Sequence, residues 1–175
     1  MKKVRNWQIL AIVFTLIIGT LLHFTYEWSG NNQIVGAFSA TNESTWEHLK
    51  LLFFPMLIFA IFEGINIYKE TNNYIEAKTI GIVFGMLFIT VFFFTYTGII
   101  GSNFAILDIG SFFVGVILSE ILAYKVMQKE SFSTSRTKLL AIIILSLLTV
   151  LFIVFTFNPP NINYFRDPVQ LTLEI

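Results

Sequence analysis

The chain has 175 residues, of which 55% are hydrophobic and 13% are charged, and its mean hydropathy is +0.75. A soluble domain contains about 25% charged residues, so this composition predicts a protein embedded in a lipid bilayer. The net charge of zero indicates no nucleic-acid partner, and the absence of cysteine excludes disulfides, thiolate metal ligands and a cysteine nucleophile.

Five apolar segments are long enough to cross a membrane, because a hydrocarbon core of about 30 Å requires about 20 helical residues. They cover residues 7–28, 45–68, 79–100, 104–127 and 138–157. No segment is long enough to form two spans. We therefore expect an all-α fold, a polytopic bundle of five transmembrane helices, with residues 1–175 forming a single domain.

The first segment follows Lys2, Lys3 and Arg5, as the apolar part of a signal peptide would. Its apolar run is longer than the roughly 7–15 residues of a signal peptide. The nearest cleavage pattern, Ala37-Phe38-Ser39, lies beyond a polar stretch. A retained transmembrane helix is the favoured interpretation, and cleavage after Ser39 is the alternative.

Lys and Arg are concentrated in alternate connections between the segments. The basic residues on one side are Lys2, Lys3, Arg5, Lys69, Lys78, Lys125, Lys129, Arg136 and Lys138. The loop 29–44 and the turn 101–103 have none, and the tail 158–175 has only Arg166. Because cytoplasmic loops carry an excess of Lys and Arg, we expect a multi-pass protein of a bacterial cell membrane with its N-terminus in the cytoplasm and its C-terminus outside.

The second helix has a clear start signal, since Ser44 and Glu47 fit a Ser-x-x-Glu capping box. Trp28 and Trp46 fall where the first two helices would meet the outer interface, as aromatic anchors do. Pro159-Pro160 ends the fifth helix, and the apolar residues after it predict that the tail 158–175 folds back over the outer face of the bundle.

Polar residues converge at this outer end. His23 and Glu27 are four residues apart and share a helix face, while Glu47 and His48 lie in the first turn of the next helix. They include the only two histidines of the chain, and the loop 29–44 joins the two helix ends. Ionisable residues inside a membrane usually mark function, so His23, Glu27, Glu47 and His48 are the candidate catalytic residues.

Three chemistries remain open for this layer. His23 and His48 with Glu27 would suit a divalent metal such as zinc, whose open position could polarise water. Alternatively, Ser44 or Ser29 would be a nucleophile with His48 as its base. A third possibility is a non-covalent haem held by the two histidines.

We expect an outward-facing site that performs metal-assisted hydrolysis or transfer on a lipid, lipid-linked or envelope substrate. The candidate substrate-binding residues are Asn42, Trp46, Asp108, Arg166 and Asp167. The alternative is a non-enzymatic membrane module, such as a partner subunit, transporter or sensor, in which the His and Glu residues form a structural lock together with Lys50.

Glu63 and Glu120 form a second layer, near the cytoplasmic ends of their helices. The simplest expectation is that they pair with Lys69, Lys125 or Arg136, whose long side chains can reach toward the interface. The alternative, which the few polar residues between the two layers disfavour, is a proton path from these glutamates to the outer histidine layer.

Two regions resemble a family of small uncharacterised bacterial membrane proteins with five helices. The resemblance rests on the following motifs: His23-x3-Glu27-Trp28-Ser29-Gly30, Asn42-Glu43-Ser44-x-Trp46-Glu47-His48-Leu49-Lys50 and Asn158-Pro159-Pro160 followed by Asp167-Pro168. It implies the five-helix architecture with these motifs on one side of the membrane, and no activity.

Overall fold

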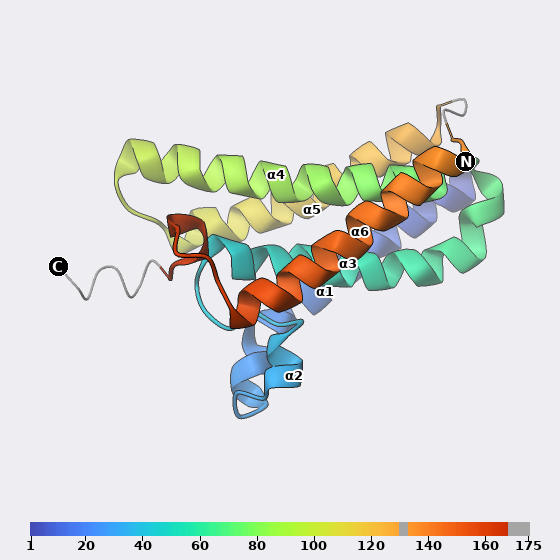
Figure 1. Cartoon of the computed structure of the whole chain (residues 1–175). Coiled ribbons are helices and arrows are strands. Elements are labelled where there is room, and N and C mark those ends of the chain that lie inside the picture. Colours follow the sequence, from blue (N-terminus) through green and yellow to red (C-terminus); the bar gives the residue numbers. More distant parts are fainter. Residues whose placement is uncertain (130–132, 168–175) are drawn as a thin grey trace.

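A computed structural model describes residues 1–129 and 133–167 of the chain, so the last part of the predicted outer tail, 168–175, lies outside the described residues. The structure is helical. Its five long helices are α1 (Lys2–Trp28), α3 (Thr45–Ile67), α4 (Tyr74–Ile100), α5 (Ala105–Met127) and α6 (Ser135–Phe157). All five are long and apolar enough to cross a membrane, which confirms the predicted number of long apolar helices (Figure 1). This architecture is that of a multi-pass membrane protein.

Three shorter elements were not predicted. They are the helix α2 (Gln33–Gly36) and the 3-10 turns η1 (Tyr68–Glu70) and η2 (Asn163–Phe165). The long helices α1, α4 and α6 also begin earlier than the apolar segments do. Hydropathy marks only the stretch that fits in lipid, whereas a helix continues through polar residues until its ends are capped. As a result Lys78, expected in a connection, lies inside α4 and is buried.

Small residues allow the helices to approach closely. A Cβ atom added to Gly81 of α4 would lie 2.6 Å from the backbone oxygen of Ser119 in α5, and one on Gly85 would collide with the Ser119 hydroxyl. A Cβ on Gly19 of α1 would similarly collide with the Leu51 carbonyl of α3. The pairs α4–α5 and α1–α3 therefore pack backbone against backbone, as small residues permit in membrane helices.

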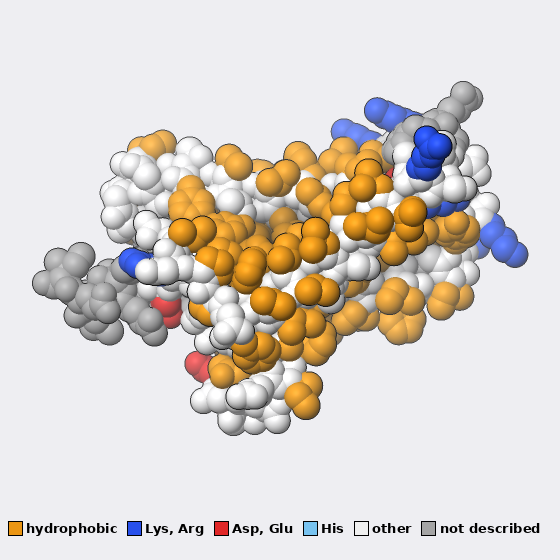
Figure 2. Space-filling model, in the orientation of Figure 1, with side chains coloured by type: hydrophobic (Ala, Val, Ile, Leu, Met, Phe, Trp, Pro, Cys, Tyr) orange, Lys and Arg blue, Asp and Glu red, His pale blue; other side chains and the backbone are white. Residues whose placement is uncertain are grey.

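The helix α6 crosses the bundle diagonally, in contact with α3 and α4 (Figure 1). Much of its surface is exposed and apolar, for example Ile143 and Leu147. On the face seen in Figure 2, hydrophobic side chains are spread along the bundle, and most of the visible Lys and Arg side chains gather at the end that holds the N-terminus. Contact of this apolar surface with water would be unfavourable, whereas contact with lipid acyl chains would be favourable.

The opposite end holds the loop 29–44 and the described part of the tail. Trp46 is only 7% exposed, because the rings of Phe152 and Phe165 pack on it at centroid distances of 4.5 and 5.0 Å. Tyr164 of η2 forms a hydrogen bond to Thr90 of α4 over 3.1 Å. The tail thus folds back onto the bundle as far as it is described, and Trp46 lies beneath it, not at an open interface as the sequence had suggested.

Candidate metal centre

The start of α3 sets the position of His48. Ser44 has an extended backbone, and its hydroxyl accepts a hydrogen bond from the Glu47 amide over 3.3 Å, which confirms it as the N-cap. The reciprocal half of the predicted capping box is wrong, because the Ser44 amide donates to Asn42 Oδ1 instead, over 2.9 Å. This cap fixes the first turn of α3, and with it the direction in which His48 projects.

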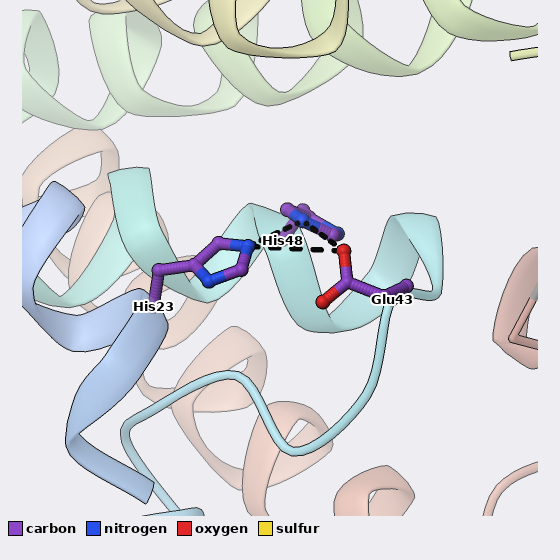
Figure 3. Close-up of side chains that lie close together, drawn as sticks. All are labelled: His23, Glu43 and His48. Carbon is purple, nitrogen blue, oxygen red and sulfur yellow. Dashed lines mark hydrogen bonds and ion pairs between the residues drawn. The ribbon is translucent and has the colours of Figure 1, made fainter. Parts of the chain in front are cut away.

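Three side chains from three segments meet beside this turn: His23 near the end of α1, Glu43 from the loop before α3, and His48 (Figure 3). The Nε2 atoms of His23 and His48 are 3.3 Å apart. The Glu43 Oε2 atom lies 3.7 Å from His23 Nε2 and 3.4 Å from His48 Nε2. Each residue therefore turns one potential ligand atom toward the same point.

The tautomer of His48 suits a ligand. Its Nδ1 atom lies 3.0 Å from the Ser44 carbonyl oxygen. A carbonyl can only accept, so in the neutral ring Nδ1 carries the proton and Nε2 keeps its lone pair for a metal. A backbone partner of this kind orients metal-bound histidines generally, and here the N-cap of α3 provides it.

The distances fit a tetrahedral metal ion. Zinc binds histidine nitrogen at about 2.0–2.1 Å and carboxylate oxygen at about 2.0–2.2 Å, so ligand atoms in a tetrahedral site are about 3.3–3.5 Å apart. The three separations of 3.3, 3.4 and 3.7 Å come close to this geometry. Three protein ligands leave the fourth position open, which is the pattern of catalytic zinc sites.

Glu43 is charged in this arrangement. Hydrogen bonding to His23, and then to His48, holds the pKa of the Glu43 carboxyl well below its usual range, although partial burial opposes this shift. The side chain is 46% exposed, against 31% for His23 and 29% for His48. The carboxylate is therefore available to a cation and is reachable from outside the bundle.

Glu27 and Glu47, both predicted to join the histidines, lie elsewhere. Glu27 is exposed and is not a member of the three-residue group found among the described residues. Glu47 is buried and forms an ion pair with Lys50 over 2.6 Å, while Thr41 donates to it from its backbone and its hydroxyl over 2.9 and 2.8 Å.

The buried Glu47–Lys50 pair is a structural lock between segments. Thr156 of α6 donates to Glu47 Oε1 over 2.9 Å. The Lys50 ammonium donates to the Gly36 carbonyl of α2 over 2.8 Å and to the Thr156 hydroxyl over 2.9 Å. The structure therefore contains a buried lock, but it consists of Glu47 and Lys50 and does not include the histidines that the alternative had placed in it.

Of the other predicted substrate-binding residues, Asp108 and Asp167 interact with members of the centre. Asp108 accepts a hydrogen bond from the Tyr96 hydroxyl and lies close enough to His48 to interact with it electrostatically. Asp167 of the tail accepts from the Glu43 amide over 3.4 Å. Arg166 instead donates to Asn161, over 2.6 and 3.2 Å. The tail therefore reaches the loop that carries Glu43.

The serine and haem alternatives do not fit this geometry. The Ser44 hydroxyl is occupied by the cap, and His48 contacts its carbonyl oxygen. The Ser29 hydroxyl donates to the Tyr26 carbonyl over 2.7 Å. Two haem ligands must approach iron from opposite faces of the porphyrin, and Nε2 atoms only 3.3 Å apart leave no room for the ring between them.

Glu43 was the residue that the sequence left unassigned, because a loop residue has no helical face to place it. Its only signal was its position five residues before His48 in the loop that joins the two histidine-bearing helices.

No curated protein and no solved structure matches the chain. A model of a protein family described as a family of unknown function (DUF6512) matches residues 1–174. The match covers nearly the whole chain, and the chain therefore belongs to the DUF6512 family.

Proposed function

We propose that this protein is a membrane-embedded, zinc-dependent hydrolase or transferase whose metal is held by His23, Glu43 and His48. One observation carries the proposal: three ligand atoms from separate segments lie 3.3–3.7 Å apart, at the spacing of a tetrahedral zinc site with one open position. Glu43 takes the place that the sequence had suggested for Glu27.

The open position defines the chemistry. A zinc ion held by His23, Glu43 and His48 would supply a water that ionises near neutral pH and a Lewis acid for a carbonyl or phosphoryl group. Asp108, which lies near His48, is placed to interact with a substrate or with the bound water. We assign two of the other predicted residues, Asn42 and Asp167, to shaping the loop, since their oxygens accept backbone hydrogen bonds from Ser44 and Glu43.

The surroundings favour a substrate with an apolar part. The Phe24 ring lies 5.0 Å from His23, centroid to centroid, and stacks on the ring of Trp28 at 5.7 Å. Both Phe24 and Trp28 are exposed. Exposed aromatic rings near the end of a membrane helix indicate the level of the lipid headgroups. A lipid or lipid-linked envelope compound would present its polar group there, on the outer face of a bacterial cell membrane.

Metal analysis of the purified protein tests the site. We expect about one zinc per chain after loading and removal of excess metal. His23→Ala, His48→Ala and Glu43→Gln should each reduce the bound zinc strongly, because each removes one of three ligands. Glu27→Gln is the matched control, since Glu27 lies one turn beyond His23 and outside the group. Zinc content that is zero in the native chain, or equal in all four variants, would refute the site.

A turnover assay separates the enzyme from a binding module. Zinc-loaded protein in nanodiscs should release headgroup or phosphate from anionic phospholipid or a lipid-linked phosphate, and chelation or His48→Ala should abolish the release. Stoichiometric zinc with no release from either class of compound would instead support a non-enzymatic sensor or partner subunit.

A further inference from the structure

A second buried cluster of charged residues lies in the half of the bundle that holds the N-terminus. Its charged members are Glu63 of α3, Lys78 of α4 and Glu120 of α5, whose side chains are 0%, 3% and 1% exposed. The sequence predicted other partners for the two glutamates, namely Lys69, Lys125 or Arg136. The structure pairs both with Lys78, because α4 begins at Tyr74 and places Lys78 one turn inside the helix.

Lys78 lies between the two carboxylates. Its ammonium group is 2.5 Å from Glu63 Oε2 and 2.7 Å from Glu120 Oε2. Gln8 of α1 completes the cluster: its amide oxygen lies 3.4 Å from the Lys78 ammonium and its amide nitrogen donates to Glu63 Oε1. Four helices therefore direct polar atoms into one enclosed position.

The charges of this cluster do not balance. Two ionised carboxylates and one ammonium have a net charge of −1, and an uncompensated charge is strongly unfavourable in a buried site. The Glu47–Lys50 pair at the other end of α3 has one charge of each sign, so that pair is balanced and the inner cluster is not. A cation must be added for the cluster to be neutral.

The hydrogen bonds distinguish the two glutamates. Glu63 accepts at both oxygens, from Gln8 at Oε1 and from Lys78 and Tyr74 at Oε2, the last over 3.1 Å. A carboxyl group surrounded by donors is stabilised in its ionised form. Glu120 has one donor, Lys78, and among the described residues its buried Oε1 atom has no hydrogen-bond partner.

We propose that this cluster is a proton-binding site, in which Glu120 is held as a neutral carboxylic acid at neutral pH while Glu63 is the ionised partner of Lys78. The bound proton makes the cluster neutral. The titratable groups that interact with Glu120 are Glu63 from α3, and Lys78 and Tyr74 from α4, while Gln8 of α1 contacts Glu63 and Lys78. The described residues of α6 direct their side-chain hydrogen bonds to Tyr68, Glu76 and Glu47 instead. Release of the proton would place a negative charge at the close contact between α4 and α5.

Infrared spectroscopy of the full chain in nanodiscs tests this proposal, because a protonated carboxylic acid has a carbonyl stretch that an ionised carboxylate lacks. The metal-free native protein should show the signal of a buried, protonated acid at neutral pH. Glu120→Gln should remove it. Glu76→Gln is the control: Glu76 also has a buried oxygen without a partner among the described residues, but it lies in the first turn of α4, where a helix stabilises negative charge. This variant should keep the signal.

Charge balance also predicts the infrared signal of the variants at the other two charged positions. Glu63→Gln should also lose the signal, because Glu120 would then be ionised and would balance the charge of Lys78. Lys78→Gln should double it, because both glutamates would then need protons. Thermal unfolding should distinguish Glu120 from Glu63: Glu120→Gln should unfold close to the native temperature, whereas Glu63→Gln leaves Gln8, Lys78 and Tyr74 with a weaker acceptor and should unfold lower.

Three results would overturn the proposal: no acid signal in the native chain, a signal that survives Glu120→Gln, or a signal that appears only when sodium is removed. The last would mean that a metal cation, and not a proton, normally balances the charge. If Lys78→Gln does not fold, the two glutamine variants at Glu63 and Glu120 still decide the question.

Discussion

The Nε2 atoms of His23 and His48 lie 3.3 Å apart, although 25 positions separate the two residues in the sequence. The contact joins the end of α1 to the first turn of α3, and Glu43 closes the triangle. Two imidazoles and one carboxylate at this spacing are a ligand set for zinc, so the consequences of the contact can be measured with the metal.

Zinc affinity should fall as the pH decreases, because protons and metal compete for the Nε2 lone pairs of the two histidines. Once the imidazoles of the metal-free chain are protonated, the loss should approach about tenfold per histidine for each further pH unit. Glu43 should not contribute in this range, because its pKa is held well below the usual value and it stays ionised. Isothermal titration between about pH 7.5 and about pH 5.5 measures the slope. An affinity that does not change with pH would contradict ligation by histidine.

Zinc should also stabilise the folded chain, because it binds only where the three segments are brought together. At a free zinc concentration of about 100 times its dissociation constant the stabilisation is about 2.7 kcal/mol. Thermal unfolding with and without a chelator measures it. The shift should persist in Glu27→Gln and disappear in Glu43→Gln; equal shifts in the two variants would place the metal elsewhere.

Replacing one partner of the Glu47–Lys50 ion pair should destabilise the fold more than replacing both partners. Lys50→Met leaves the Glu47 carboxylate buried without its cation, which should destabilise the fold by about 3–5 kcal/mol. Combining it with Glu47→Gln removes the stranded charge and should recover part of that loss. A double-mutant cycle on unfolding free energies measures the coupling. Additive effects of the two substitutions would show that the ion pair contributes nothing.

Gly85→Ala should destabilise the bundle, because its Cβ would collide with the Ser119 hydroxyl at the α4–α5 contact. Overpacking of this kind costs about 1–3 kcal/mol. Gly98→Ala is the matched control in the same helix, since a Cβ there meets nothing within 4 Å. This control should be neutral or slightly stabilising, by up to about 1 kcal/mol, because alanine favours helix. Equal unfolding temperatures for the two variants would argue against the close packing.

The absence of cysteine makes the membrane orientation easy to test. Gln33→Cys and Asn72→Cys place single thiols at exposed positions at opposite ends of the bundle. If the positive-inside rule holds, a membrane-impermeant maleimide should label Gln33→Cys on intact cells and Asn72→Cys only after permeabilisation. The reverse pattern would place the histidine centre in the cytoplasm and exclude an envelope substrate.

The sequence alone determined the number of long helices, the N-cap at Ser44 and the meeting of the two histidine-bearing helix ends. These follow from local physics: a hydrocarbon core sets span length, a side-chain oxygen caps a helix, and a short loop keeps the ends of its helices close. The period of a helix also placed His23 and Glu27 on one face.

Only the tertiary structure decided which groups share a site. The rotation of α3 turns His48 toward α1 and the adjacent Glu47 toward Lys50 and α6, and the course of the loop brings in Glu43 where Glu27 had been expected. The early start of α4 likewise made Lys78 the partner of Glu63 and Glu120. Periodicity fixes neighbours along a helix, but the packing of side chains between helices fixes how each helix is rotated and what a loop residue can reach.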